Sequence, residues 1–388
     1  MRILIVNGHL RTGGTEKSLV NFLKNLDYDK NKVDLLLFEG LGEYLEDIPQ
    51  EVNIISYDLR KTYGSFIKVV LSAIKNFDWN TVFLKIVMML RSRITVKATG
   101  LMKIFHVTAK KYDCAIAYRV GLCNDYVSFA VKAKKKYMWW HHGEFNYDEN
   151  TVKQWRKSLR NIDEIICVSD YSKELIQPHF PEHRTKMKVI SNILDIENIL
   201  RKSIEFNPYL NKEKKTIIVS VGRLSPEKKM INAVYAMDSL IKQGYLHIKW
   251  YLVGDGQEKE IIEKEIRDRG LEEFVICVGS QANPYPYINN ADFYVHTSYV
   301  ESQGISVLES MVLEKCGVVT RSRGVEEFIQ DNINALLADQ TVESLVKKII
   351  TILDNPLVLE KLKKNQLDTA KLYSADNIVK KIESLLEE

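Results

Sequence analysis

The stretch YVESQGISVLESMVLEKCGVVTRSRGV, Tyr299–Val325, decides how we interpret the rest of the chain. It places two acids, Glu301 and Glu309, on either side of a small-residue turn that runs into an apolar helix and then into a buried strand. Gly304 lets the backbone approach a ligand closely, and the free N–H groups at the start of the next helix face an anion. This arrangement is typical of a nucleotide-binding loop.

A purely structural interpretation of the same acids stays open. Ser306 and Glu309 have the spacing of a capping box, in which Glu309 would close the start of its own helix. The choice between the two interpretations depends on the motifs elsewhere in the chain.

Length and composition fit a globular protein of two or three domains, with 388 residues of which 45% are hydrophobic and 27% charged. No window reaches the roughly 18 uninterrupted apolar residues of a membrane span. The cysteines are odd in number and never form a CxxC pair, so we expect a reducing, cytoplasmic location and neither a disulfide framework nor a zinc site. They are Cys114, Cys123, Cys167, Cys277 and Cys316.

The segment 60–111 is basic, with Asp78 as its one acid among apolar side chains. This composition favours helices that lie on an anionic membrane surface. The alternative is a pair of amphipathic helices that cover a sheet. No motif of a nucleic-acid module is present, so we expect no nucleic-acid partner. The basic residues are Arg60, Lys61, Lys68, Lys75, Lys85, Arg91, Arg93, Lys97, Lys103, Lys110 and Lys111.

The chain begins with a predicted strand, glycine turn and helix. Arg2–Gly8 is a near-continuous apolar run, Gly13 and Gly14 form the turn, and Glu16–Leu26 has helical spacing. A phosphate or sugar could approach such a turn. The position after Gly13 is not lysine, which excludes a P-loop nucleoside triphosphatase.

Alternating strands and helices predict an open doubly wound sheet in the first half. Ligands bind such sheets beyond the carboxyl ends of the strands, which places Gly13, Gly14, His141 and His142 at one rim. His141 and His142 are adjacent on a strand and point to opposite faces, so we expect no shared metal ion. The further strands are 32–38, 52–58, 114–119, 136–142, 164–169 and 187–193.

A second doubly wound domain follows a linker at 196–215. Its strands are expected at 216–222, 248–254, 275–279, 293–297 and 318–321, and its last helices at 342–353, 357–371 and 375–386. After the first of these strands, GRLSPEKK places Arg223 at the strand end and Lys228 in the first turn of a helix expected over 227–242. Arg223 and Lys228 could converge on a diphosphate, and the alternative is that both are surface charges. Cations in a first helical turn are unfavourable for the helix dipole, so Lys228 and Lys229 predict a bound anion. The cleft between the domains is the natural ligand site.

These motifs together resemble the retaining GT-B glycosyltransferases of the glycosyl group 1, or family 4, type. The resemblance rests on GRLSPEKK (222–229), YLVGDGQEKEII (251–262), the stretch 274–311 and GVVTRSRGVEEFI (317–329). Looser matches are Gly13-Gly14-Thr15-Glu16 and His142-Gly143.

The resemblance implies two doubly wound Rossmann-like domains that face each other across a cleft. Residues 1–195 would bind the acceptor and 216–372 the nucleotide-sugar, with 373–388 a helix that is a candidate to pack back on the first domain. Glu301 and Glu309 would be the acids of the E-x7-E motif, the first near the transferred sugar and the second on the ribose. The implied catalytic residues are His142, Glu301, Arg223 and Lys228, and the implied substrate-binding residues are Gly13, Gly14, Ser302, Gln303, Gly304, Ile305 and Glu309.

The implied activity is transfer of a hexosyl or N-acetylhexosaminyl unit from a nucleotide-sugar, expected to be a UDP-sugar, in capsule, exopolysaccharide or cell-wall glycan synthesis. The acceptor would be a lipid-linked or surface polysaccharide, with peripheral contact to an anionic membrane as a candidate interaction. No metal or other cofactor is expected, because Arg223, Lys228 and helix dipoles would serve the diphosphate. The alternatives are a nucleotide-sugar epimerase and a non-catalytic partner subunit. Ser302 and Gln303 depart from the family pattern, and we expect them to choose the donor sugar.

Overall fold

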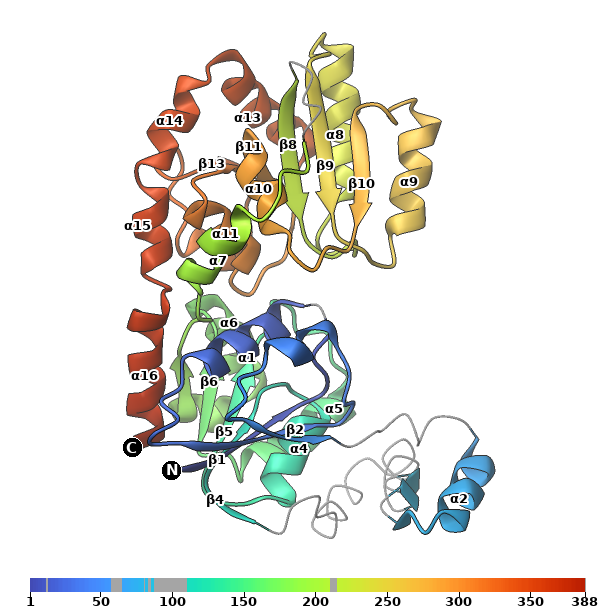
Figure 1. Cartoon of the computed structure of the whole chain (residues 1–388), viewed down its shortest axis with the longest axis vertical. Helices are drawn as coiled ribbons and strands as arrows, with labels where there is room; N and C mark the ends of the chain where they lie inside the picture. The colour runs from blue at the N-terminus through green and yellow to red at the C-terminus, as the bar shows by residue number, and fades with distance from the viewer. Residues whose placement is uncertain are drawn as a thin grey trace. The chain divides into compact units, whose positions relative to one another are not determined.

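The computed structural model describes residues 1–11, 13–56, 65–79, 81–82, 85–86, 110–209 and 215–387 (Figure 1). The chain forms two compact units: unit 1 is Met1–Ser191 with Val379–Glu388, and unit 2 is Asn192–Ile378. The boundary thus falls after Ser191, where we expected it after residue 195. Each unit is described by itself, and the expected cleft between them stays a prediction. Most of the predicted basic segment 60–111 lies outside the described residues.

Unit 1 contains a parallel seven-stranded sheet in the order β3-β2-β1-β4-β5-β6-β7. Ile3, Leu4, Ile5 and Val6 of β1 are fully buried, which explains the uninterrupted apolar run, because helices cover both faces of such a strand. The strands are β1 (Arg2–Asn7), β2 (Lys32–Leu37), β3 (Asn53–Ser56), β4 (Lys111–Ala117), β5 (Lys132–Trp140), β6 (Glu164–Cys167) and β7 (Met187–Val189).

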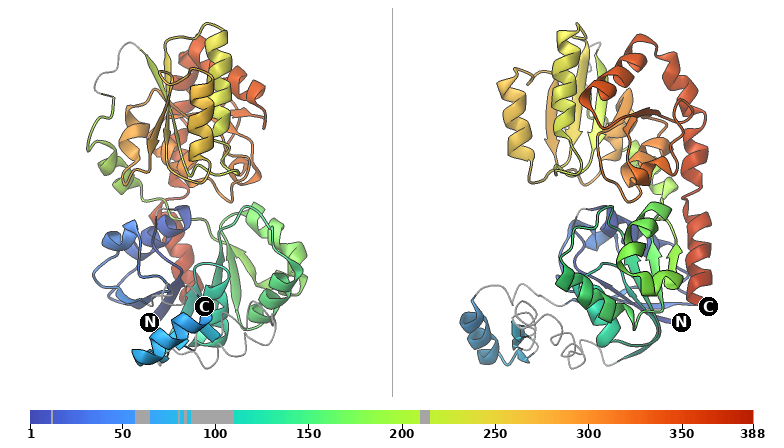
Figure 2. Two further views of the ribbon diagram at one scale, coloured as in Figure 1. Left: turned by 90° about the vertical axis from the view of Figure 1, so that its right-hand side faces the viewer. Right: turned by 180° about the vertical axis from the view of Figure 1, so that it is seen from behind.

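Helices lie on both faces of this sheet (Figure 2). On one face the rings of Phe22 of α1, Tyr118 and Trp139 pack against one another, and on the other Trp140 packs against Trp155 of α5. The hydroxyl of Tyr137 donates to the carbonyl of Leu385 at 2.9 Å, which ties the end of the chain to unit 1. The helices are α1 (Gly14–Lys24), α2 (Phe66–Lys75), α4 (Leu122–Phe129), α5 (Glu149–Leu159), α6 (Asp170–Ile176) and α16 (Ala375–Glu387), with short 3-10 turns at Glu43–Asp47, Gln177–His179 and Pro181–Lys186.

Unit 2 contains a parallel six-stranded sheet in the order β10-β9-β8-β11-β12-β13. Its strands are β8 (Thr216–Val221), β9 (Ile248–Val253), β10 (Val275–Gly279), β11 (Phe293–His296), β12 (Cys316–Thr320) and β13 (Leu336–Ala338). Strand β13 was not predicted, because three residues are too few to show a periodic pattern. The doubly wound fold predicted for both halves is confirmed.

Two separate apolar clusters cover the two faces of the unit 2 sheet. The helices α8 (Ile231–Lys242), α9 (Lys259–Asp268), α13 (Val342–Asp354) and α14 (Leu357–Lys363) contribute to one cluster. The helices α7 (Ile196–Ser203), α10 (Tyr285–Asn290), α11 (Ile305–Val312) and α15 (Gln366–Lys371) contribute to the other, and a short helix, α12 (Arg323–Glu326), follows β12.

Three expectations for unit 2 need correction. The first part of the expected linker is helix α7, whose Ile199 is buried. The helix expected over 357–371 is two helices, because the buried amide of Gln366 bonds to the backbone of Cys316 and the chain turns there. Helix α8 begins at Ile231, four residues later than the expected 227.

Candidate active site

In both sheets the strand order reverses between two neighbouring strands, β1 and β4 in unit 1 and β8 and β11 in unit 2. Ligands of open parallel sheets bind beyond the carboxyl ends of strands at this switch point. The loops that follow these four strands are therefore where functional side chains should lie.

In unit 2 the loops after β8 and β11 are bonded to each other. The backbone N–H of Tyr299 donates to the carbonyl of Glu227 at 3.0 Å, and the hydroxyl of Thr297 donates to the carbonyl of Lys228 at 2.8 Å. Lys228 therefore lies in a turn that precedes α8 and not in the first turn of the helix, as we had expected. The bonded loops fix the backbone of Lys228 against the strand end of β11.

Glu301 is the centre of a buried polar cluster at this rim. One carboxylate oxygen, Oε1, accepts from Nζ of Lys228 at 2.6 Å and lies 2.9 Å from Nε2 of His296. Burial alone would raise the pKa of Glu301, but the charge of Lys228 and the hydrogen bond from His296 outweigh burial and lower it. Glu301 is therefore ionised at neutral pH, and His296 donates to it through Nε2.

Sequence reasoning missed His296. It is the last residue of β11, only 3% exposed, and no described residue bonds to its other ring nitrogen, Nδ1. The available signal was a titratable side chain that ends an otherwise apolar buried strand, five residues before Glu301. We assign His296 the role of holding the carboxylate of Glu301 in place.

Helix α11 begins without a side-chain cap, so the capping-box interpretation of Glu309 is wrong. The N-cap residue is Gly304 at φ +83°, and the hydroxyl of Ser306 bonds to that of Tyr294 at 3.1 Å. Glu309 is buried, and its Oε1 accepts from the hydroxyl of Tyr285 at 3.3 Å. Glu309 thus lies in the second turn of the helix that starts at the switch-point loop.

Gly304 is required sterically as well as by its positive φ. A Cβ at this position would lie 2.6 Å from Cγ1 of Val325, so the turn is packed directly against the loop after β12. Ile305 and Ser302 are half-buried on either side of it. Gln303 is 2% exposed, and its side-chain oxygen accepts from the backbone and the amide of Asn192. Donor choice by Ser302 and Gln303 stays a prediction.

Arg223 is an exposed cation in the loop after β8. Its side chain is 67% exposed, and Nη2 donates to Glu227 at 3.1 Å within the same loop that carries Lys228. The loop after β8 thus carries an exposed guanidinium, Arg223, and a cation, Lys228, that is already paired with an acid. Arg223 follows the strand end as the sequence predicted, whereas Lys228 lies in a turn instead of the predicted helix.

Unit 1 carries a second polar cluster at its own switch point, which sequence reasoning also missed. Nη1 of Arg119, just beyond β4, lies 3.1 Å from Oε1 of Glu16 and 3.0 Å from Nε2 of His9, just beyond β1. Burial lowers the pKa of His9, while Glu16 acts in the opposite direction and Arg119 lowers it again. A Cβ on Gly13 would lie 2.5 Å from Oε2 of Glu16, so the glycine turn leaves room for this carboxylate. Gly14 is the first residue of α1.

His141 and His142 lie on opposite faces of the sheet, as the strand geometry predicted. The ring of His141 packs 4.8 Å from Tyr118, on the side of α1, whereas that of His142 lies 5.6 Å from Trp140. Within the described residues no group of three or more His, Cys, Asp or Glu side chains could hold a metal ion. The role of His142 toward a sugar stays a prediction.

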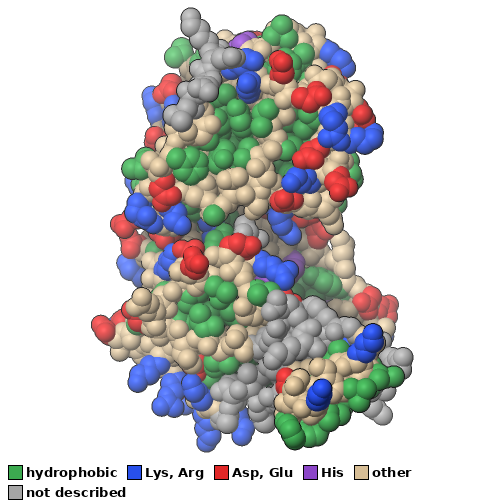
Figure 3. All heavy atoms as spheres, turned by 45° about the vertical axis from the view of Figure 1, so that its right-hand side comes forward, with side chains coloured by type: hydrophobic (Ala, Val, Ile, Leu, Met, Phe, Trp, Pro, Cys, Tyr) green, Lys and Arg blue, Asp and Glu red, His purple; other side chains and the backbone are tan. Residues whose placement is uncertain are grey.

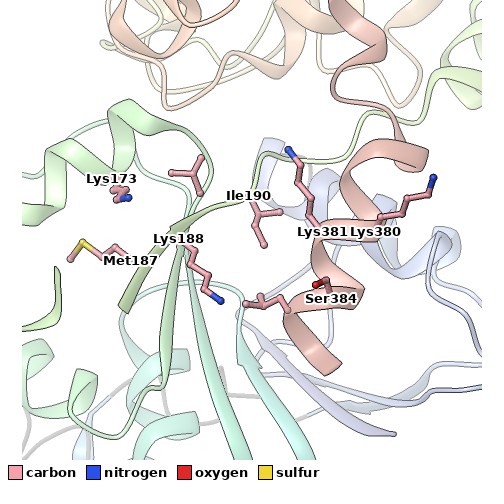
Figure 4. Close-up of a pocket in the computed structure, with 9 residues that line it drawn as sticks. Lys173, Met187, Lys188, Ile190, Lys380, Lys381 and Ser384 are labelled. Carbon is pink, nitrogen blue, oxygen red and sulfur yellow. The ribbon is translucent and has the colours of Figure 1, made fainter. Parts of the chain in front are cut away.

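A groove of about 590 Å³ lies in unit 1 between α6, β7 and α16, three strands away from β4 (Figure 4). Lys188 is paired with Glu164 at 2.9 Å, and the labelled lysines extend in different directions. Lysines on and beside an edge strand prevent edge-to-edge association, which accounts for this groove without a ligand. The lysines are Lys173, Lys188, Lys380 and Lys381.

Comparisons with known proteins agree with this geometry. Residues 201–369 match the family described as glycosyl transferases group 1. The chain is 27% identical over 199 residues to the poly(ribitol-phosphate) alpha-N-acetylglucosaminyltransferase of Staphylococcus aureus, covering 50% of this chain and 40% of that protein. It is 21% identical over 384 residues to the GalNAc-alpha-(1->4)-GalNAc-alpha-(1->3)-diNAcBac-PP-undecaprenol alpha-1,4-N-acetyl-D-galactosaminyltransferase of Campylobacter jejuni, covering 97% and 96%.

The matches to the first curated relatives span about two fifths of those proteins' length. The crystal structure of Anabaena Alr3699/HepE in complex with UDP and glucose is similar over 100% of both chains, with a TM-score of 0.75 and 19% identity. This similarity shows the fold. Residues 201–369 therefore match the glycosyl transferases group 1 domain, and the chain has the GT-B fold of two doubly wound units.

Proposed function

We propose that the protein transfers a hexosyl or N-acetylhexosaminyl unit from a UDP-sugar to a lipid-linked or surface polysaccharide acceptor, with retention of the anomeric configuration. The observation that carries this proposal is the buried cluster of Glu301, Lys228 and His296 at the switch point of unit 2. The choice of UDP follows the Anabaena protein of the same fold, which was crystallised in complex with UDP and glucose. The acceptor classes follow the names of the two relatives.

The roles follow from charge and position. Arg223 and Lys228 bind the diphosphate and stabilise the charge that develops on it as the bond to the anomeric carbon breaks. Glu309 accepts from the ribose hydroxyls and Glu301 from a hydroxyl of the donor sugar. In the proposed front-face transfer the acceptor oxygen bonds to the anomeric carbon, the diphosphate leaves with the electron pair, and the acceptor proton passes to the diphosphate.

Because Lys228 and Glu301 are 2.6 Å apart, the two roles are coupled. When Lys228 turns toward a diphosphate, Glu301 loses its strongest partner and keeps His296, which holds its carboxylate for the sugar. No step in this scheme uses a metal ion, and we expect activity to survive chelation with EDTA.

The test is a panel of UDP- and GDP-sugars incubated with the protein and candidate acceptors, with release of the nucleoside diphosphate as the readout. We expect release with at least one UDP-sugar, and its increase when an acceptor is added. No release from any donor would refute the proposal. Product analysis of UDP-N-acetylglucosamine without acceptor separates transfer from epimerisation, since an epimerase converts the donor without any acceptor.

We further propose that α2 holds unit 1 on an anionic membrane, at the cytoplasmic face. Val69 and Ala73 of this helix are buried, while apolar side chains on its other face are exposed next to Lys68 and Lys75 (Figure 3). Apolar side chains that insert at the interface and lysines at the headgroups account for this pattern. The exposed apolar residues are Phe66, Ile67, Leu71 and Ile74 in α2, and Phe77 and Trp79 just beyond its end.

Cosedimentation with vesicles tests this contact. Wild-type protein should bind vesicles that contain anionic lipid and bind neutral vesicles less, and I67D/L71D should lose binding at unchanged melting temperature. Equal binding by the double variant would contradict the proposal. Among the described residues no helix has the length and apolarity that crossing a membrane requires.

A further inference from the structure

The cluster at the switch point of unit 1 is organised around a cation. Nη1 of Arg119 donates to both Glu16 and His9, whereas in unit 2 one oxygen of Glu301 accepts from both partners. A guanidinium only donates, so Nε2 of His9 accepts from it, while Nδ1 of His9 lies 3.3 Å from the backbone nitrogen of Arg11 and 3.8 Å from Oε1 of Glu16. Glu16 and His9 both bond to Nη1 of Arg119, so two side chains hold this end of the guanidinium.

Arg119 uses only one of its three guanidinium nitrogens, Nη1, in its bonds to Glu16 and His9. No described residue bonds to Nε or Nη2, and the side chain is 33% exposed while that of Glu16 is only 6% exposed. A buried acid therefore anchors one end of the guanidinium, and the side chain as a whole stays partly exposed. A planar guanidinium with two unused donors binds a phosphate or carboxylate in bidentate fashion.

Of the charged groups around this cluster, Arg119 is the one suited to bind an anion. Arg11, the next cation along the loop, is itself paired with Glu39 at 3.0 Å. Burial lowers the pKa of His9, so its ring is neutral and adds no competing positive charge. The donor roles proposed above use the loops of unit 2 and do not use Arg119.

We infer that Arg119 is an acceptor-binding residue, which takes a phosphate or carboxylate group of the acceptor at the switch point of unit 1. Glu16 and His9 are its positioning residues. This inference rests on the proposed function, since it assigns an anionic group to the acceptor of the proposed transfer.

The test titrates inorganic phosphate, and separately acetate, into the full chain labelled with ¹⁵N at the arginine side chains and saturated with UDP. We expect one Nε–Hε resonance to shift, and that resonance to be missing from Arg119→Gln. Arg160→Gln, an exposed arginine of the same unit, should keep the full response. The affinity for phosphate should fall by about tenfold in Arg119→Gln, the loss expected for one charge-assisted contact.

A response to either anion that depends on Arg119 supports the inference, and a response unchanged in Arg119→Gln overturns it. If UDP abolishes the response, the anion is the diphosphate of the donor, and the assignment to the acceptor is wrong. Arg119→Lys keeps a charge for Glu16 but lacks the planar fork, so it serves if Arg119→Gln does not fold, and undiminished phosphate binding there also overturns the inference. The affinity for UDP, measured in each variant, should stay at the wild-type value. A wild-type protein that does not bind UDP would instead refute the proposed function.

Discussion

The two switch points use the same three kinds of side chain in opposite ways. Unit 2 places an acid at the centre, with Lys228 and His296 donating to Glu301, whereas unit 1 places a cation at the centre, with Arg119 donating to Glu16 and His9. An acid at the centre can accept a hydrogen bond from a ligand hydroxyl once Lys228 moves away. A cation at the centre keeps N–H groups that can donate to a ligand. The same sheet topology thus supports one site suited to a hydrogen-bond donor of the ligand and one site suited to an anionic ligand group.

The two sites also differ in how firmly their loops are packed. In unit 2 a glycine at positive φ, Gly304, contacts Val325, and a Cβ on Gly324 would clash with the carbonyl of Glu301. In unit 1 Gly13 has an extended φ of −180°, and the nearest atom to a Cβ there would be a terminal carboxylate oxygen of Glu16. We therefore expect substitutions in unit 2 to cost more stability than their counterparts in unit 1.

The largest effect is expected for Lys228→Met. Removing the cation leaves Glu301 buried beside His296 alone, which should destabilise unit 2 by about 3 kcal/mol. Turnover of the donor should fall by a factor on the order of 10² to 10³, the scale for losing one preorganised charge contact. Lys229→Met, which removes the adjacent lysine, is the control. Steady-state kinetics and hydrogen exchange in β11 measure the two effects; equal losses in both variants would mean that the pairing with Glu301 is unimportant.

Gly304→Ala and Gly13→Ala compare the packing of the two turns. The first forces a side chain into the left-handed region and against Val325, at a cost of about 2 kcal/mol. The second needs only a shift of the Glu16 carboxylate and should stay within about 1 kcal/mol. Hydrogen exchange of backbone amides in each unit measures the loss of stability of that unit separately. A larger loss for Gly13→Ala would invert the comparison.

Glu309→Gln tests whether the second acid binds nucleotide or only supports the helix. The amide keeps an acceptor for Tyr285 but carries no charge, so UDP affinity should fall by about tenfold while the melting temperature changes little. Tyr285→Phe is the matched control for the loss of the hydrogen bond alone. A fall in melting temperature with unchanged UDP affinity would restore a purely structural role for Glu309.

The smallest effects concern pH. The lowered pKa of Glu301 means that its contribution to stability is present above its ordinary value of 4.5 and is lost as pH falls below it. His9, also lowered, contributes above 6.5 and loses its contribution as pH falls below that value, with Glu16, Arg119, Arg11 and Glu39 as the charges around it. The free energy of unfolding should therefore fall less steeply with decreasing pH than in wild type, below pH 6.5 for His9→Gln and below pH 4.5 for Glu301→Gln. Superimposable pH profiles for wild type and variants would contradict these assignments.

Much of the fold was predictable because parallel sheets leave a simple pattern. Continuous apolar runs such as β1 and β8 are long enough to recognise, and both doubly wound sheets follow from their alternation with helices. Strand β13 is too short for this, and the start of α8 is shifted because the chain after Pro226 first forms a turn that bonds to Tyr299. Such tertiary bonds have no local signature.

The site was predictable where residues form a motif within one loop, as for Glu301, Glu309 and Lys228. The pairing of Lys228 with Glu301 was not, because 73 residues separate them and the contact depends on strand order. His9, Arg119 and His296 belong to no motif in the sequence, and only the switch point brings them to their partners. The capping-box spacing of Ser306 and Glu309 misled because Gly304, two residues earlier, already begins the helix.

Calorimetric titration of UDP into wild type, Glu309→Gln and Arg119→Gln tests the central claim that the nucleotide is bound by unit 2 and not by the cation of unit 1. We predict about tenfold weaker binding for Glu309→Gln and wild-type affinity for Arg119→Gln, since a charge-assisted contact is lost only in the first. Wild-type affinity in Glu309→Gln together with weakened binding in Arg119→Gln would contradict the account.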